Sequence, residues 1–503
     1  MRKKRENGGD ASTLVSKDLE INERWAEREF AQCMDVKMRK ATFWTGKERS
    51  VLFMYCEGLA EPRQIDEIVI PGLRGALEQI GIRSLNEKIL LEHWPTSAIE
   101  TERNLDELTL KLFNGQLVLF FDGVDSAFVL DISRIPSRKP EDSNTEVSVR
   151  GPRDGFVEEL TVNVALIRKR IKSKSMSYEQ FRIGRRGRTR IGLLYIRDII
   201  RPELVEEVRK RLSNIDIDAL YSINELEEQI SESSWSLFPT VDYTGRPDYA
   251  VASLLRGRFV LLLDGVPTVL IGPGNLTLLF KTAEDLHTSY SFVAFGRMLR
   301  LIGLFITLLL PGFYIGITTY HPDQIPLTLL ATIVVNRKGV PFPTPLEAII
   351  MLTAFELFRE AGIRLPTAIG MTLTVVGGLV IGDASIRAGL TSPSLLVVIA
   401  ITAVSSFTLV NQSLVGAVSI VRLVTILAAS VLGIFGFLLS VFVILVYLAK
   451  IRSFGLPYLA PVSPFNFGDF VHALFRLPRT KITRRPNILG TTDSKRRKGA
   501  KHS

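Results

Sequence analysis

The sequence has very little cysteine and lacks the motifs of common catalytic sites. Its 503 residues include only Cys33 and Cys56, which form no C-x-x-C pair, so we expect reduced thiols rather than a disulfide framework. No G-x-x-x-x-G-K-[S/T], H-E-x-x-H or G-x-S-x-G motif occurs, and the histidines are far apart along the chain. We therefore expect no enzyme activity, no catalytic residue, no metal site and no cofactor.

The N-terminus lacks an apolar stretch that could act as a signal peptide. Basic residues cluster at positions 2–5, but no run of about 7 to 15 apolar residues follows them. We therefore expect the first domain to remain in the cytosol. Much of the net charge of +10 lies at the N-terminus, from Arg168 to Arg190 and from Arg476 to Lys501. Because no aromatic residues alternate with these charges, we expect no nucleic-acid binding.

Charged residues are frequent in the first half of the chain and scarce between Leu299 and Leu448. Several apolar runs in this region approach or exceed the roughly 20 residues that a helix needs to cross a bilayer. They show no strand-like alternation of apolar and polar residues, so we expect transmembrane helices. Four full spans are expected, from Leu299 to Thr318, Pro366 to Gly382, Pro393 to Val410 and Val421 to Leu448.

Two further apolar runs, Leu327 to Val335 and Leu346 to Phe358, are too short to cross a bilayer upright. They suit broken or interfacial helices, but tilted crossings would raise the number of spans from four to six. With either number the chain returns to the side on which it starts. Lys450 and Arg452 after the last span agree with a cytosolic exit.

The first half of the chain contains an internal repeat. GQLVLFFDGV begins at Gly115 and GRFVLLLDGV begins at Gly257, 142 residues later. Asp-Gly between two β-rich runs favours a tight hairpin in each copy. A second match, at a distance of 140 residues, aligns Pro62 with Pro202, each at the start of a predicted helix. We infer a duplicated unit of strand, helix, connection and hairpin; the alternative is a shared α/β pattern without duplication.

The predicted fold is an α/β soluble N-terminal region of two related subdomains, followed by an α-helical multi-pass transmembrane bundle and a basic C-terminal tail. The predicted boundaries are a basic and polar N-terminal segment at 1–45, subdomain 1 at 46–172, subdomain 2 at 173–290, the transmembrane domain at 291–450 and a cytosolic tail at 451–503.

Ionisable residues within apolar segments suggest a function, because burying them without partners costs several kcal/mol. The candidates are Glu347, Glu356, Asp383, Arg387 and Arg422. Two interpretations stay open. In the first, most of these residues lie at interfacial depth or pair with one another. In the second, some of them face a conduit for ions or small polar solutes. Glu347, Glu356, Asp383 and Arg422 are the predicted conduit or gating residues.

The chain resembles the A subunit of GerA-family spore germinant receptors in four long motifs. They are VRGPRDGFVE from Val149, RIGRRGRTRIGLLYI from Arg182, SSWSLFPTVDYTGRPDYAVASLLRGRFVLLLDGVP from Ser233 and PGFYIGITTYHPDQIP from Pro311. The resemblance extends over nearly the whole chain except its two tails. The first motif contains a candidate functional loop, formed by Arg150, Gly151, Pro152, Gly155 and Phe156.

This resemblance implies a multi-pass subunit of a nutrient receptor in the spore inner membrane, with its N-terminal domain and C-terminal tail on the cytosolic side. It also implies a transporter-like B subunit, a lipoprotein C subunit and membrane lipid as partners. The chain would form a homo-oligomer that helps to couple germinant binding to ion release. In one version of this expectation, the oligomer itself conducts the ions. The alternative is a solute transporter with a cytosolic regulatory domain, which predicts inverted repeats in the membrane half.

Overall fold

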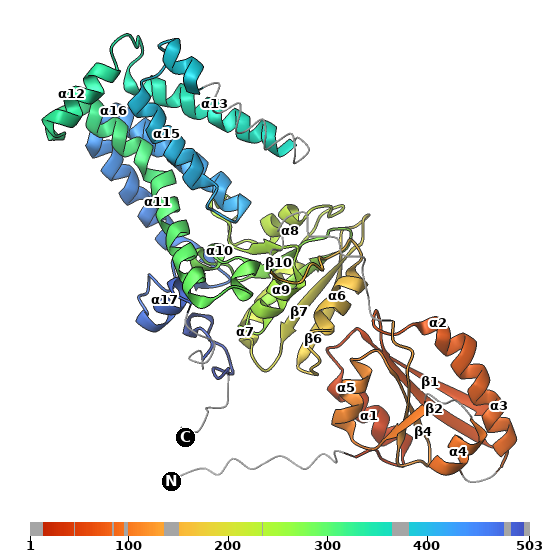
Figure 1. Cartoon of the computed structure of the whole chain (residues 1–503). Helices are drawn as coiled ribbons and strands as arrows, with labels where there is room; N and C mark the ends of the chain where they lie inside the picture. Colours follow the sequence, from red (N-terminus) through yellow and green to blue (C-terminus); the bar gives the residue numbers. More distant parts are fainter. Residues whose placement is uncertain are drawn as a thin grey trace, which may run out of the picture. The chain divides into compact units, whose positions relative to one another are not determined.

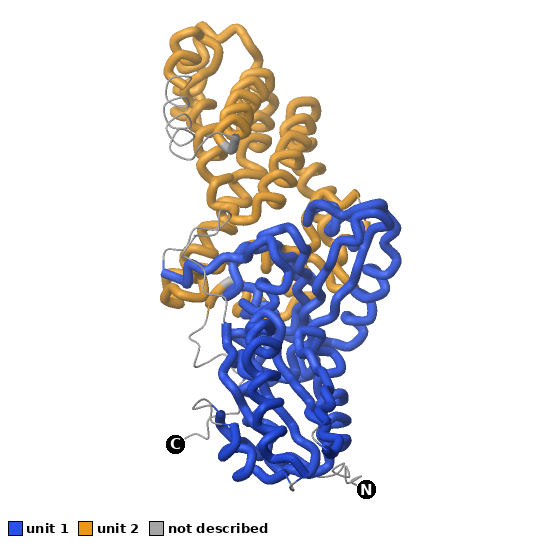
Figure 2. Tube along the Cα trace, turned by 90° about the vertical axis from the view of Figure 1, so that its right-hand side faces the viewer, with its two compact units in different colours: residues 1–231, 243–273, 483–503 blue, residues 232–242, 274–482 orange. Residues whose placement is uncertain are grey.

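The computed structural model describes residues 14–44, 46–82, 85–94, 99–134, 150–233, 235–364, 382–476 and 484–496. The chain forms two compact units, coloured blue and orange in Figure 2. Unit 1 comprises Met1–Ser231, Tyr243–Pro273 and Thr483–Ser503, and unit 2 comprises Glu232–Asp242 and Gly274–Ile482. Each unit is thus built from segments that are distant in sequence.

Unit 1 contains two five-stranded sheets of the same design, which are shown in red to orange and in yellow to green in Figure 1. The elements of subdomain 1 are α1 (Leu19–Glu29), β1 (Val36–Trp44), β2 (Glu48–Cys56), α2 (Pro62–Gln64), the π-helix η1 (Ile65–Val69), α3 (Ile70–Ile80), α4 (Glu87–His93), β3 (Ile99–Glu102), α5 (Leu105–Leu112), β4 (Leu117–Phe121) and β5 (Ala127–Leu130). Their strand order is β1-β2-β4-β5-β3.

Subdomain 2 repeats this arrangement. Its elements are α6 (Leu160–Arg168), β6 (Met176–Ile183), β7 (Thr189–Ile196), α7 (Pro202–Ser213), α8 (Ile223–Ile230), β8 (Asp242–Thr244), α9 (Pro247–Leu254), β9 (Phe259–Leu263) and β10 (Val269–Gly272). The strand order β6-β7-β9-β10-β8 matches that of the first sheet. Register agrees too, since Val51 pairs with Phe121 and Ile191 pairs with Leu263. The two subdomains therefore share one topology and register, as the predicted repeat requires.

The local signals of the repeat act as expected. Pro62 and Pro202 occupy the first turns of α2 and α7. The first N–H groups of a helix have no acceptor within it, so a proline there costs no hydrogen bond. Gly123 and Gly265 have φ angles of +86° and +88° in the β4–β5 and β9–β10 hairpins, a backbone conformation that glycine adopts without strain.

The strand β4 is apolar throughout because both faces of its sheet are covered. Leu117, Leu119 and Phe121 face a core formed with α3 and α4, whereas Val118 and Phe120 face a second core formed with α1 and α5. Side chains of a strand alternate between faces, so a strand that is covered on both has no polar positions.

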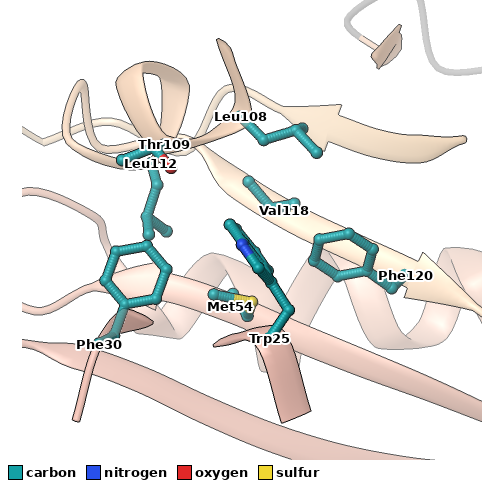
Figure 3. A pocket seen from close by; sticks show the side chains of 8 residues that line it. All are labelled: Trp25, Phe30, Met54, Leu108, Thr109, Leu112, Val118 and Phe120. Atoms are coloured by element: carbon teal, nitrogen blue, oxygen red, sulfur yellow. The ribbon is translucent and has the colours of Figure 1, made fainter. Parts of the chain in front are cut away.

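A small cavity lies in the second of these cores, between α1, α5 and the sheet (Figure 3). Trp25 packs edge-on against Phe30 and Phe120, with ring centroids 5.8 and 6.4 Å apart. The hydroxyl of Thr109, which also lines the cavity, donates to the Leu105 carbonyl. The cavity volume of about 10 Å³ would hold at most one water molecule, so this space offers no ligand site.

The subdomain boundaries differ from those expected at residues 46 and 173. Strand β1 pairs with β2 along its full length, and α1 packs into the core of subdomain 1. Both elements therefore belong to subdomain 1, although β1 is largely exposed and polar because it is an edge strand. Likewise α6 opens subdomain 2, since the Asp264 carboxylate accepts a hydrogen bond from the Leu160 amide at its N-terminus.

Unit 2 is mostly helical, and Figure 1 shows its long helices lying side by side. Its elements are α10 (Leu276–Leu279), the 3₁₀ turn η2 (Ala283–Leu286), α11 (Tyr290–Tyr320), the 3₁₀ turn η3 (Pro322–Gln324), α12 (Leu327–Asn336), α13 (Thr344–Arg364), α15 (Pro393–Ser406), α16 (Gln412–Lys450), the short strands β11 (Arg452–Ser453) and β12 (Leu456–Pro457), and α17 (Phe467–Leu474).

Two of the described helices, α11 and α16, are long and apolar enough to cross a membrane. As predicted from its short apolar run, α12 ends after 10 residues. Helix α13 has 21 residues and extends beyond the expected Leu346 to Phe358, whereas α15 has only 14. The expected span from Pro366 to Gly382 lies outside the described residues except at its last position, so four to six spans remain a prediction.

The span expected from Val421 to Leu448 is not one straight helix. Gly433 has φ +61° and ψ −141° within α16, and a Cβ at Gly436 would lie only 2.1 Å from the Ala428 carbonyl oxygen. Leu414 and Leu448 share one buried cluster, although a straight helix would place them about 50 Å apart. Helix α16 is therefore a helical hairpin with its tip at Gly433.

The two ends of the helical part of unit 2 meet. The Leu237 amide donates to the Tyr447 hydroxyl at 2.9 Å, and the Leu276 amide donates to the Tyr458 carbonyl at 3.0 Å. We call this end the base, formed by residues 232–242, 274–289 and 451–476. The residues expected as a tail from 451 are therefore partly folded into the base, and residues 484–496 belong to unit 1.

Candidate functional site

Glu347, near the start of α13, is completely buried and fully hydrogen-bonded. One carboxylate oxygen accepts from the Ser392 amide at 3.0 Å and from the Ser392 hydroxyl at 3.2 Å. The other accepts from Arg337 at 3.1 Å. These donors replace the hydrogen bonds to water that the carboxylate loses on burial. They also connect α13 to the segments before and after this helix.

Glu356, two and a half turns further along α13, forms a second set of contacts with the first half of α16. One carboxylate oxygen accepts from the buried Arg422 guanidinium and from the Ser419 hydroxyl. The other pairs with Arg359 at 2.5 Å, and Arg359 also donates to Ser419. We call Glu356, Arg359, Ser419 and Arg422 the α13–α16 cluster. Two guanidinium groups share one carboxylate in it.

The structure brings together some of the predicted residues and leaves others apart. Glu356 and Arg422 are partners, whereas Glu347 binds different groups on the same helix. Asp383 pairs with Arg387, four residues later, and both side chains are more than half exposed. Asp383 therefore belongs to neither set of contacts.

Several partners were missed from the sequence. Two sets of contacts are completed by four residues, Arg337, Arg359, Ser392 and Ser419. The spacing of Glu356 to Arg359 and of Ser419 to Arg422, three residues in each helix, was a usable signal, because such residues share a helix face. Their meeting across two helices depends on the tertiary fold, which no local spacing encodes.

An acidic residue in the base holds the first turns of α11. Asp285 accepts from Arg297 at 2.9 Å and from Arg300 at 3.1 Å. Burial of Asp285 opposes its ionisation, but the hydrogen bond from Arg300 and the charges of Arg297 and Arg300 outweigh burial and hold the pKa of Asp285 below its usual value. Arg297 and Arg300 thus tie the N-terminal part of α11 to the base.

A second buried ion pair joins the two subdomains of unit 1. Arg168, at the end of α6, makes a bidentate contact with Asp35 at 2.7 and 2.9 Å. Its guanidinium also lies 4.3 Å from the Phe113 ring centroid. Both cysteines are next to this pair, and burial raises the pKa of the Cys33 and Cys56 thiols, so neither is an activated nucleophile.

The loop from Arg150 to Phe156 lies against subdomain 2. Phe156 is buried and its amide donates to the Gly245 carbonyl at 2.9 Å. Asp154 pairs with Arg170, and the Asn163 side chain exchanges two hydrogen bonds with the Val157 backbone. These contacts fix the loop as the entry to α6, and a further role for Arg150, Gly151, Pro152 and Gly155 stays a prediction.

The ionisable side chains of the helical unit pair mainly with residues of other segments. Within the described parts of the chain, no group of three or more His, Cys, Asp or Glu side chains could hold a metal ion. Arg422 and Glu347 are buried and pair with the partly exposed Glu356 and Arg337, so removing either of these partners would leave a buried charge without its ion pair. These pairs join α13 to α16 and to the residue that follows α12.

Comparison with known proteins identifies related chains. The family described as "Bacillus/Clostridium GerA spore germination protein" matches residues 24–488. Spore germination protein XA of Bacillus anthracis is 44% identical over 485 residues, covering 96% of this chain and 99% of that protein. Spore germination protein KA of Bacillus subtilis (strain 168) is 34% identical, covering 96% and 89%.

A solved structure also matches part of the chain. It is the crystal structure of the N-terminal domain of the A subunit of the Bacillus megaterium spore germinant receptor GerK3. The two share 25% sequence identity with a TM-score of 0.42, and the match covers 52% of this chain and 98% of that chain.

Proposed function

This chain belongs to the GerA family of spore germination receptor A subunits, and we propose that it transmits germinant binding into ion release across the spore inner membrane. In this proposal a transporter-like B subunit and a lipoprotein C subunit complete the receptor. Several copies of the chain assemble so that their helical units line a conduit.

Exposed aromatic residues support placing unit 2 in a membrane. Tyr290, Phe292 and Phe295 lie at the start of α11 and are all more than half exposed, and Trp235 in the base is 95% exposed. Aromatic side chains at the end of apolar helices favour the boundary between headgroups and hydrocarbon. The base would then lie at the membrane surface, with α11 and both halves of α16 extending into the bilayer.

The path of the chain supports a cytosolic location for both ends. The segments that enter α11 and leave α16 meet in the base, which requires an even number of crossings between them. Residues 484–496 fold with unit 1, so they share its compartment. Unit 1 would face the spore core, with the basic segments of the chain on the same side.

The observation that carries the proposed gate is the α13–α16 cluster. Arg422 is almost fully buried in an apolar helix, and its carboxylate partner Glu356 lies on a neighbouring helix. Separating these charges in apolar surroundings costs several kcal/mol. The pair therefore holds α13 beside α16, and in this proposal its carboxylate attracts cations into a conduit that these helices line and that germinant binding opens.

Neutralising Glu356 tests this role. In lipid vesicles containing the purified chain, Glu356→Gln should lower potassium efflux about tenfold, equivalent to about 1.4 kcal/mol in the barrier. The physical reason is that the cluster then holds two guanidinium charges and no carboxylate, which repels cations. A potassium-sensitive fluorescent indicator outside the vesicles measures the rate of efflux.

Asp383→Asn is the matched control, because its carboxylate pairs with Arg387 on an exposed helix face, and its efflux should equal that of the wild type. Equal efflux from wild-type and Glu356→Gln vesicles with the same protein content would contradict the conduit. Uptake of labelled solute without potassium efflux would instead favour a transporter.

A further inference from the structure

The two repeats of unit 1 differ in the path of the chain after the last hairpin. In subdomain 1 the chain continues from β5 along the loop between β2 and α2. The Arg134 amide donates to the Leu59 carbonyl at 2.7 Å, and Ser133 forms an antiparallel bridge with Ala60. This short extended segment closes one end of the first sheet.

In subdomain 2 the corresponding residues are absent from that place, because the chain turns away after β10. The Gly274 amide donates to the Thr240 carbonyl, and the Leu276 amide donates to the Tyr458 carbonyl, all within unit 2. The loop after β7 nevertheless has the same form as the loop after β2. The Ile199 amide donates to the Ile196 carbonyl just as the Leu59 amide donates to the Cys56 carbonyl.

The C-terminal segment occupies the vacated place. The Thr492 amide donates to the Ile199 carbonyl at 3.0 Å, and the Thr492 hydroxyl donates to the Ile200 carbonyl at 3.0 Å. The first of these contacts corresponds to that of Arg134 with Leu59, and the second adds a side-chain hydrogen bond to the next residue of the loop. Residues from the far end of the chain thus complete the second repeat.

Two equivalent glycines provide an independent check of this correspondence. A Cβ at Gly115 would lie 3.0 Å from the Ser133 Cβ, and a Cβ at Gly257 would lie 2.3 Å from the Thr491 Cγ2. Gly115 and Gly257 hold the same position in the two repeats. Thr491 therefore takes the place of Ser133, and the close approach leaves no room for a side chain at either glycine.

The C-terminal segment is folded to present these threonines. Arg484 and Lys495 form an antiparallel bridge, and the Arg485 guanidinium bonds to Asp493 and to the Leu255 carbonyl. Leu489 is buried at 2% exposure just before them. The segment therefore has its own internal hydrogen bonds and an apolar anchor, unlike a solvated tail.

We infer that subdomain 2 carries a docking surface for an extended segment, built from Ile199, Ile200, Leu255 and Gly257, and that its occupant is residues 484–496 of the same chain. The helical unit is thereby connected to subdomain 2 both before α11 and after α16. On the proposed receptor function, on which this consequence rests, a movement of subdomain 2 acts on both ends of the helical unit.

Cysteine crosslinking of the full-length chain in membranes tests the docking. With Cys33 and Cys56 replaced by alanine, the introduced pair Ile199→Cys with Thr491→Cys should form a disulfide crosslink under a mild oxidant, because Ile199 and Thr491 both lie against Gly257. The result expected is a crosslink within one chain. The matched control is Leu59→Cys with Thr491→Cys, because Leu59 is the equivalent residue of subdomain 1 and its place is already filled by Ser133 and Arg134.

Crosslinking no faster than in the Leu59 control would overturn the docking, and products of twice the mass would overturn the assignment to the chain's own segment. Adding Thr492→Pro removes the N–H donor to Ile199 and should slow the crosslink severalfold; an unchanged rate contradicts the proposed hydrogen bond. Because this readout needs no germinant, a negative result here leaves the receptor function standing, and a failed efflux experiment leaves the docking standing.

Discussion

At the scale of single residues, the molecule depends on a few ion pairs in which at least one charge is buried. Arg168 with Asp35, Asp285 with Arg297 and Arg300, and Glu356 with Arg422 all join segments that are distant in sequence or separated by a turn. A buried charge that loses its partner is far more costly than an exposed one. Substitutions at these positions should therefore have effects that matched exposed pairs do not show.

Arg168→Ala should lower the free energy of unfolding of unit 1 by about 3–5 kcal/mol, because it leaves the Asp35 carboxylate buried without its partner. Urea unfolding of the full chain in detergent, followed by the fluorescence of the tryptophans in subdomain 1, measures this change. Arg185→Ala is the control, since Arg185 and Asp216 form an exposed pair. Equal midpoints for the two variants would contradict the role assigned to Arg168.

The base should lose stability in acid through Asp285. Its folded pKa lies below the ordinary value of about 3.9 for aspartate, so its stabilisation is present above that value and is lost as pH falls through the lower folded pKa. The wild-type melting temperature should fall between about pH 5 and about pH 3. Asp285→Asn should show a smaller fall, whereas Asp383→Asn should follow the wild type. Parallel curves for all three proteins would count against this assignment.

At the scale of elements, local signals predicted the repeat well and the helical unit less well. Asp-Gly turns and prolines at helix starts act within a few residues, so β4, β5, β9, β10, α2 and α7 were predictable. The edge strand β1 was missed because its exposed face is polar. The hairpin in α16 was missed because both halves are uniformly apolar, so hydropathy gives no sign of the turn.

The sequence identified the charged residues of the candidate site but not the contacts between them. Glu356 and Arg422 stand out as charges in apolar segments, yet their pairing joins residues 66 positions apart. Asp383 shows the limit of the same criterion, because it pairs on an exposed helix face instead. Hydropathy identifies charged residues in apolar segments, but the packing of the helices determines which of them form ion pairs.

Gly433→Ala should destabilise the helical unit by about 1–3 kcal/mol, because φ +61° with ψ −141° is a conformation that other residues adopt only with strain. A Cβ there would also lie 2.9 Å from the Tyr320 Cβ. Gly416→Ala is the control, since it lies within the helix with open space around it and should be neutral or stabilising by up to about 1 kcal/mol. Thermal unfolding in detergent compares the two, and a neutral Gly433→Ala would contradict the hairpin.

At the scale of the whole molecule, one α/β unit occurs twice but has different surroundings in each copy. The first copy closes its sheet with the residues just after β5, whereas the second releases those residues toward α11 and is closed by residues from the C-terminus. The second copy thus has a position that the end of the chain fills. On the proposed receptor function, the second copy would be the one that passes a signal to the helices.

Charge reversal across the Glu356–Arg422 pair tests the central claim most directly. Spores that carry Glu356→Arg or Arg422→Glu should lose potassium release after addition of a mixture of amino acids, sugars and nucleosides, because each change places like charges together between α13 and α16. The double variant should recover release, since it restores an opposite pair in the same place. Release that is unaffected by either single change, or a double variant no better than the singles, would contradict the account.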